Sequence, residues 1–147
     1  MKPDRYGCEV TWRGGLLGEA VTDNGVQVEY STPPEYGGET KMLTPEETFL
    51  ASIDMCLHMA FQTAAKALGA DVVSYRCRAE GFVEPTEDGR RYFSRIVLRP
   101  RIAVAGESIQ KAARALKLAE KMCLVSNSLR SEMSLEPHIA AVGLEAR

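Results

Sequence analysis

The sequence predicts an α+β fold in which antiparallel sheets pack on two main helices. Three observations favour this class: segments of alternating polar and apolar residues, turn signals that join neighbouring segments, and two long helical patterns. Hairpins dominate and no regular βαβ unit appears, so we expect antiparallel pairing. A chain of 147 residues with no repeat or low-complexity linker is expected to form a single domain over residues 1–147.

Turn signals divide the first part of the chain into strands. Residues 7–31 have the pattern of β structure, with a turn at Asp23-Asn24-Gly25 between strand-like segments. Proline and glycine make residues 31–42 a loop. This part therefore predicts three strands followed by a loop.

A second hairpin is predicted later in the chain. Residues 72–84 and 92–104 alternate around the turn PTEDGR. In the second of these segments the apolar side chains share one face, and the other face, most simply a solvated one, carries Arg95, Arg99 and Arg101. Pro100 favours an edge or bulge position. Residues 132–139 alternate as a final strand.

The two helices have recognisable ends. Thr44 is a candidate N-cap, Pro45 fits the first helical position, and Glu47 completes a capping box. This helix should stop near Leu68, with Gly69 as its C-terminal cap. The second helix begins near Ser108, and its inner stripe consists of Ile109, Ala112, Leu116 and Ala119 and continues to Cys123. Ser126 or Asn127 is expected to cap a short continuation.

Composition excludes several classes of function. The net charge is −2 and there is no long basic run, so nucleic-acid binding has little electrostatic support. No run of apolar residues is long enough for a membrane span, and the first ten residues lack the apolar core of a signal peptide, which favours a cytoplasmic protein. The four cysteines form no CxxC pair, so we expect no metal site, no cofactor and no structural disulfide.

Two of the cysteines occupy comparable places. Cys56 lies on the inner side of the first helix, and Cys123 ends the inner stripe of the second. Each thiol is explained either by core packing or by a chemical role, since free cysteine is among the most buried residue types. If both helices pack on one sheet, the two thiols can meet.

The order of motifs resembles the OsmC/Ohr family of cysteine-based organic hydroperoxide reductases and osmotically inducible relatives. The resemblance runs over roughly residues 10–137 and rests on GGLLGEAVTDNG, STPPEYGG, TPEETFLASIDMC and CLVSNSL. It implies an intertwined homodimer in which each site is built from both chains. It also implies thiol-dependent reduction of organic hydroperoxides to alcohols, in defence against oxidative stress.

Roles follow from the resemblance position by position. Cys56 matches the peroxidatic cysteine, and Cys123 matches the resolving cysteine that forms a disulfide with it. Glu46 matches a glutamate that orients an arginine beside the thiol; taken alone, a glutamate there is explained by the helix dipole. The partners implied are an organic hydroperoxide and an external dithiol, in some members a lipoylated protein.

The chain departs from the family pattern in two places. Leu16 follows the glycine pair Gly14-Gly15, where the hydroperoxide reductases carry the arginine; Arg13 is the candidate substitute cation. Leu124 replaces a frequent proline after Cys123. Because the obvious stabiliser of the thiolate is missing, two alternatives stay open: a non-enzymatic protein that binds small molecules, and a redox sensor.

Other side chains near Cys56 have competing interpretations. An apolar pocket for a fatty or aryl hydroperoxide is expected from Phe49, Met55, Met59 and Phe61. His58 is either an ordinary packed histidine or a group that tunes Cys56. Cys77 is expected to pack in the core, and Asp54 to face solvent or the dimer partner.

Overall fold

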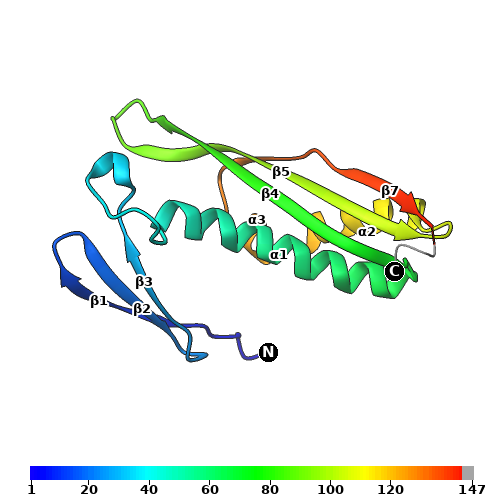
Figure 1. The fold of residues 1–147 in the computed structure, drawn as a ribbon, viewed down its shortest axis with the longest axis horizontal. Helices are drawn as coiled ribbons and strands as arrows, with labels where there is room; N and C mark the ends of the chain where they lie inside the picture. The colour runs from blue at the N-terminus through cyan, green and yellow to red at the C-terminus, as the bar shows by residue number, and fades with distance from the viewer. Residues whose placement is uncertain (144–147) are drawn as a thin grey trace. The chain divides into compact units, whose positions relative to one another are not determined.

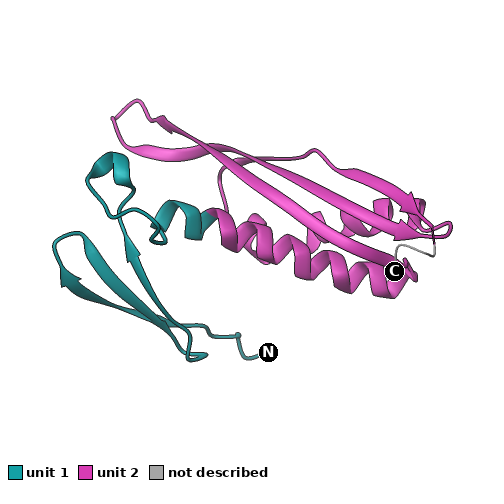
Figure 2. Ribbon diagram, in the orientation of Figure 1, with its two compact units in different colours: residues 1–49 teal, residues 50–147 magenta. Residues whose placement is uncertain are grey.

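The computed structural model describes residues 1–143, and the chain divides into two compact units (Figure 2). Unit 1 comprises Met1–Phe49 and unit 2 comprises Leu50–Arg147. The single domain predicted over residues 1–147 includes four residues, 144–147, that lie outside the described part of the chain. In residues 1–143 no helix has both the length and the apolar character needed to cross a membrane.

Unit 1 is a three-stranded antiparallel sheet of β1 (Cys8–Gly14), β2 (Leu17–Thr22) and β3 (Gln27–Ser31) in that order (Figure 1). The predicted Asp23-Asn24-Gly25 turn joins β2 to β3: the Gly25 amide donates to the Thr22 carbonyl at 2.9 Å, and Gly25 has φ +89°. The tight turn between β1 and β2 places Gly14 at φ +101° and Gly15 at φ +54°, a conformation that favours glycine.

The loop after β3 is held close to the sheet. It contains the short 3-10 helix η1 (Pro34–Tyr36), and the Ser31 hydroxyl accepts a hydrogen bond from the Glu39 amide at 3.0 Å. A side chain at Gly38 would overlap the Thr32 carbonyl oxygen, so only glycine fits there. The predicted loop therefore has a fixed backbone path.

Helix α1 (Pro45–Leu68) has the bounds that its capping residues predict. The Glu47 amide donates to the Thr44 hydroxyl oxygen at 3.1 Å, and that hydroxyl donates to the Glu47 carboxylate at 3.1 Å. At the other end Gly69 has φ +67°, its amide donates to the Lys66 carbonyl, and the Ala70 amide donates to the Ala65 carbonyl. These paired bonds form a Schellman motif.

The sheet of unit 2 contains the second predicted hairpin. Strands β4 (Val72–Pro85) and β5 (Arg91–Ala105) pair antiparallel along most of their length. The predicted final strand is in fact two, β6 (Glu132–Leu135) and β7 (His138–Val142), and both run parallel to β5. The expectation of antiparallel pairing was wrong for them, because the helical segment after β5 carries the chain back to the start of the sheet.

Pro100 lies in β5, an interior strand, and not at an edge as its residue type suggests. It is paired with Cys77 of β4 on one side. On the other side it lies opposite the break between β6, whose pairing ends at Leu98–Leu135, and β7, whose pairing begins at Arg101–His138. A proline is tolerated here because its missing N–H costs no ladder hydrogen bond where the neighbouring strand is interrupted.

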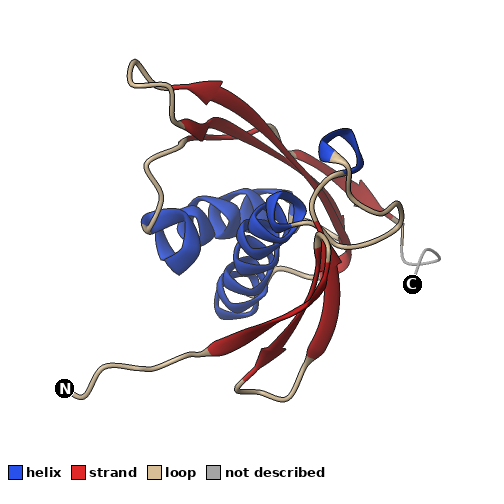
Figure 3. Ribbon diagram, turned by 90° about the vertical axis from the view of Figure 1, so that its left-hand side faces the viewer, coloured by secondary structure: helices blue, strands red, loops and turns tan. Residues whose placement is uncertain are grey.

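The remaining helices are α2 (Ile109–Met122) and α3 (Leu124–Asn127). Within unit 2, α1 and α2 cover the same face of the sheet (Figures 1 and 3). The core between helices and sheet is built from fully buried side chains that include Ile53, Leu57, Phe61, Ile96, Leu98, Val104, Ala112, Leu116 and Ala119. The predicted inner stripe of α2 is therefore confirmed, except that Ile109 is 37% exposed.

Two predicted caps have different roles. Ser108 stands at the N-cap of α2, but its hydroxyl accepts the Asp71 amide at 3.0 Å and makes no bond to the helix. The N-cap of α3 is Cys123 and not Ser126 or Asn127, both of which lie inside the turn. The extended backbone of Cys123, with ψ 101°, separates α2 from α3.

Candidate active site

The structure brings the thiols of Cys56 and Cys123 together. Cys56 lies in the fourth turn of α1 and is partly exposed, whereas Cys123 is fully buried at the corner between α2 and α3. Both are free thiols, and Cys123 is near enough to Cys56 to raise the pKa of its thiol. Two free thiols this near each other are candidates for disulfide formation.

Opposing effects act on the ionisation of Cys56. Burial raises the pKa of the Cys56 thiol above its ordinary value, and the neighbouring Cys123 sulfur raises it further. The backbone amides of Val125 and Leu124 lower this pKa by hydrogen bonding, without reversing the shift. Among residues 1–143, the groups with the largest effects on the pKa of Cys56 include no cation.

Cys123 is held by the segment that follows it. The Ser126 hydroxyl donates a hydrogen bond to the Cys123 sulfur at 3.0 Å. Because α3 starts at Leu124, the same turn directs two backbone amides at Cys56 and one hydroxyl at Cys123. The segment CLVSNSL thus contacts both sulfur atoms.

Tyr75 of β4 is a neighbour of the thiols that the sequence analysis missed. Its ring lies 4.6 Å from that of His58 and 5.3 Å from that of Phe61, centroid to centroid. Its hydroxyl is buried and makes no hydrogen bond within the described residues, and burial raises its pKa, so it stays protonated. The strand alternation that points Cys77 inward also points Tyr75 inward, and this signal was available in the sequence.

Asp54 faces β4 and not solvent as expected. Burial, followed by the hydrogen-bonded Asp54 carboxylate, raises the pKa of Cys77 to about 12. Cys77 is half-buried and is not one of the buried core side chains, so its predicted core position was wrong; it stays a thiol at neutral pH. His58 packs on Tyr75 and has its ring nitrogen 3.3 Å from the Gln62 amide nitrogen.

The candidate pocket residues lie on different sides of α1. Phe61 is fully buried against Tyr75, whereas Met55 and Met59 are 61% and 57% exposed. Phe49 is half-buried. The two methionines therefore form an exposed apolar stripe, and Phe61 belongs to the core beneath the sheet.

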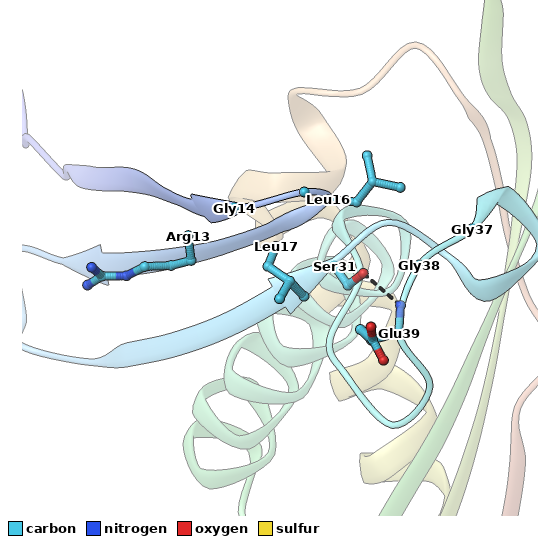
Figure 4. A pocket seen from close by; sticks show the side chains of 9 residues that line it. Arg13, Gly14, Leu16, Leu17, Ser31, Gly37, Gly38 and Glu39 are labelled. Atoms are coloured by element: carbon cyan, nitrogen blue, oxygen red, sulfur yellow. Dashed lines mark hydrogen bonds between the residues drawn. The ribbon is translucent and has the colours of Figure 1, made fainter.

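The other candidate residues lie in unit 1. Arg13 donates to the Glu19 carboxylate at 2.6 Å, and Leu16 is 55% exposed at the tip of the β1–β2 turn. Glu46 is exposed in the first turn of α1. A hollow of about 420 Å³ is lined by Arg13, Leu16, Ser31, Glu39 and neighbouring glycines; the Arg13 side chain extends along the strands, away from Ser31 and Glu39 (Figure 4).

A protein-family model described as OsmC-like protein matches residues 38–138. This match covers well over half of the chain, which therefore belongs to the OsmC-like family. The resemblance inferred from the sequence motifs is confirmed. A search of the curated proteins found no match.

Solved structures share the fold. An OsmC-like protein of unknown function from Vibrio cholerae has a TM-score of 0.85 and 23% identity, over 92% of this chain and 100% of that one. An organic hydroperoxide resistance protein from Elizabethkingia anophelis has a TM-score of 0.72 and 21% identity, over 96% and 99%. The organic hydroperoxide resistance protein OhrB of Bacillus subtilis has a TM-score of 0.64 and 19% identity, over 93% and 98%. At these identities the similarity establishes the fold alone.

Proposed function

We propose that this protein is a thiol-dependent peroxidase that reduces organic hydroperoxides to alcohols in the cytoplasm, as part of oxidative stress defence. One observation carries the proposal: the Cys56 and Cys123 thiols are close enough to interact, the first within the apolar stripe of α1 and the second at the end of the stripe of α2. Membership of the OsmC-like family supports it, because some structural neighbours are described as organic hydroperoxide resistance proteins.

In the first half of the proposed cycle, Cys56 is the nucleophile. Its thiolate attacks the distal oxygen of the hydroperoxide, the O–O bond breaks, and the alkoxide takes a proton and leaves as the alcohol. The sulfur is oxidised to a sulfenic acid and the peroxide is reduced. The buried, protonated Tyr75 hydroxyl is a donor close to the thiol pair that suits the stabilisation of a developing alkoxide.

In the second half, Cys123 resolves the sulfenic acid. The Cys123 sulfur attacks the Cys56 sulfur, the S–O bond breaks and water leaves, which gives a Cys56–Cys123 disulfide. An external dithiol, in some relatives a lipoylated protein, then exchanges with this disulfide and is itself oxidised. The Ser126 hydroxyl donates to the Cys123 sulfur at 3.0 Å and so helps to hold that sulfur in position for this attack.

Activation of Cys56 is the weak step in this scheme. The thiolate is the nucleophile, and burial raises the pKa of the Cys56 thiol. We propose that Glu46 and a cation, with Arg13 as the candidate, complete the site. The Glu19 carboxylate already neutralises Arg13, so we expect slow peroxidase turnover that rises with pH.

The substrate and assembly follow from exposed apolar side chains. Met55 and Met59, with Phe49, suit the apolar tail of a fatty or aryl hydroperoxide, and Phe61 supports them from the core. The sheet of unit 1 exposes Val10 and Trp12 at 57% and 74%. Exposed aromatic and aliphatic side chains of this size are typical of an interface, so we expect a homodimer.

Peroxide consumption tests the function. Cumene hydroperoxide and dihydrolipoamide are mixed with the wild-type protein, with Cys56→Ser and with Cys123→Ser; Cys77→Ser serves as the matched control because it removes a thiol outside the pair. We expect turnover in the wild type and in Cys77→Ser only. Equal consumption by Cys56→Ser and the wild type would exclude the mechanism.

The second candidate is a non-enzymatic member that binds an apolar small molecule. The raised pKa of Cys56 and the leucine at position 16 favour it. It predicts that hydroperoxide oxidises Cys56 no faster than the exposed Cys8. Selective oxidation of Cys56 in a mass-spectrometric time course excludes this candidate.

A further inference from the structure

Four arginines form a cluster on the face of the β4–β5 sheet that is turned away from the helices. Arg76 is directly opposite Arg101, and Arg78 is directly opposite Arg99. The residues that alternate with them on β4, Tyr75 and Cys77, point to the other face, where the Tyr75 ring meets α1. Like charges directly opposite each other in a sheet are destabilising, and here two successive rows repeat that arrangement.

The charge of the cluster is only partly balanced. Arg99 forms ion pairs with Glu136 at 2.8 Å and with Glu80 at 3.4 Å. Between residues 1 and 143 no ion pair reaches Arg76, Arg78 or Arg101. Arg101 also lies opposite His138 of β7. A protein tolerates such repulsion between like charges at a binding site, because the bound ligand supplies the missing negative charge.

The four arginines line a hollow of about 380 Å³. This volume falls within the range of small-molecule sites. The planar guanidinium group binds phosphate and carboxylate oxygens in pairs, which makes a ring of arginines a suitable site for a multiply charged oxyanion.

The surroundings of the hollow favour a short ligand. Glu80 and Glu136 border the Arg99 end and would repel an extended polyanion that continued past it. The net charge of the chain is −2, so no wider positive field attracts nucleic acid. We propose that the arginine cluster, which consists of Arg76, Arg78, Arg99 and Arg101, binds a small anion with two or more adjacent phosphate groups, such as an inorganic oligophosphate or the phosphate chain of a nucleotide.

Calorimetric titration of the full chain with inorganic tripolyphosphate, diphosphate and orthophosphate tests the proposal. We expect one site per chain and an affinity for tripolyphosphate at least about tenfold above that for orthophosphate, because more guanidinium groups are engaged. The double variant Arg76→Gln/Arg101→Gln should lose at least about tenfold in affinity for tripolyphosphate. The matched control Arg5→Gln/Arg114→Gln removes the same charge from exposed positions elsewhere and should bind as the wild type does.

Thermal unfolding separates binding from a folding defect. Without ligand the Arg76→Gln/Arg101→Gln variant should be at least as stable as the wild type, since a repulsive row is removed. Tripolyphosphate should raise the melting temperature of the wild type and of the control, but not of that variant. Comparison with ATP identifies the source: binding tighter than that of tripolyphosphate supports a nucleotide, and equal or weaker binding supports an inorganic oligophosphate.

Three outcomes would overturn the proposal. They are equal loss of affinity in the cluster variant and the control, absence of saturable tripolyphosphate binding, and tighter binding of an oligonucleotide than of tripolyphosphate through the same arginines.

Discussion

The rate at which Cys56 reacts with iodoacetamide should depend steeply on pH. Burial raises the pKa of this thiol above that of a free cysteine. A free cysteine with a pKa of ~8.5 is only about 3% thiolate at pH 7, and the raised pKa makes this fraction smaller for Cys56. The alkylation rate should therefore rise about tenfold per unit between pH 7 and 9, with no plateau in that range.

Peptide mapping by mass spectrometry measures this rate at each cysteine separately. The fully reduced protein is treated for short times across the pH series, and the exposed Cys8 in the same samples corrects for the reagent. The variant Cys77→Ser, which leaves the thiol pair intact, controls for general effects of removing a cysteine. The pH profile of Cys56 should be the same in this variant as in the wild type.

A plateau for Cys56 below about pH 8 would refute the reasoning, because it requires a substantial thiolate population near neutrality. That result would mean that a nearby cation lowers the pKa of Cys56 by more than burial and the neighbouring sulfur raise it. Peroxidase turnover should follow the same curve as alkylation if attack by Cys56 limits the rate. Turnover that is independent of pH over this range would place the slow step in resolution or in reduction by the dithiol.

Three further predictions concern single positions. Thr44→Ala should lower the free energy of unfolding by about 1 kcal/mol in urea titrations, because it removes both cap bonds, and Thr44→Ser should retain them. Leu16→Arg, at the exposed position where the hydroperoxide reductases carry arginine, should lower the pH midpoint of Cys56 alkylation by about 1–3 pH units. An unchanged midpoint, or an equal shift in the uncharged control Leu16→Gln, would contradict this prediction. Asp54→Asn should lower the pKa of Cys77, since the carboxylate that raises it is gone, and alkylation of Cys77 at about pH 9 should become faster; no change would exclude that contact.

Local features of the fold were predictable from the sequence. The bounds of α1 follow from Thr44, Pro45 and Gly69, whose effects act within one helical turn. The turn at Gly25 and the β4–β5 hairpin follow likewise from residues adjacent in the chain. Each of these predictions required only the chemistry of neighbouring residues.

Non-local features were harder to predict. The strand predicted over 132–139 divides at the Glu136-Pro137 step, and both parts pair in parallel with β5, a partner more than thirty residues earlier. Nothing in the alternation of these residues specifies the direction of a distant partner. The predicted edge or bulge position of Pro100 was wrong for the same reason, since an interior strand accepts this proline only because the neighbouring strands are interrupted beside it.

The candidate site shows the same division. The helical stripes placed Cys56 and Cys123 on inner faces, but their contact depends on how α1 meets the α2–α3 corner. Tyr75 was missed because an inward tyrosine is ordinarily explained by packing. Its significance comes from a buried hydroxyl that has no hydrogen-bond partner among residues 1–143, which only the three-dimensional arrangement reveals.

The two units carry different parts of the proposed chemistry. The thiol contact, the amides of Leu124 and Val125 and the Ser126 hydroxyl all belong to unit 2, so disulfide closure and exchange depend on that unit. The candidate activating residues, Arg13 and Glu46, belong to unit 1, as does Leu16. Under the proposed function, the leucine at position 16 is expected to slow attack on peroxide and to leave the thiol pair intact. Separate measurement of sulfenic acid formation and of disulfide closure would show whether the first step alone is impaired, and hence whether this chain is a slow peroxidase or a disulfide-forming sensor.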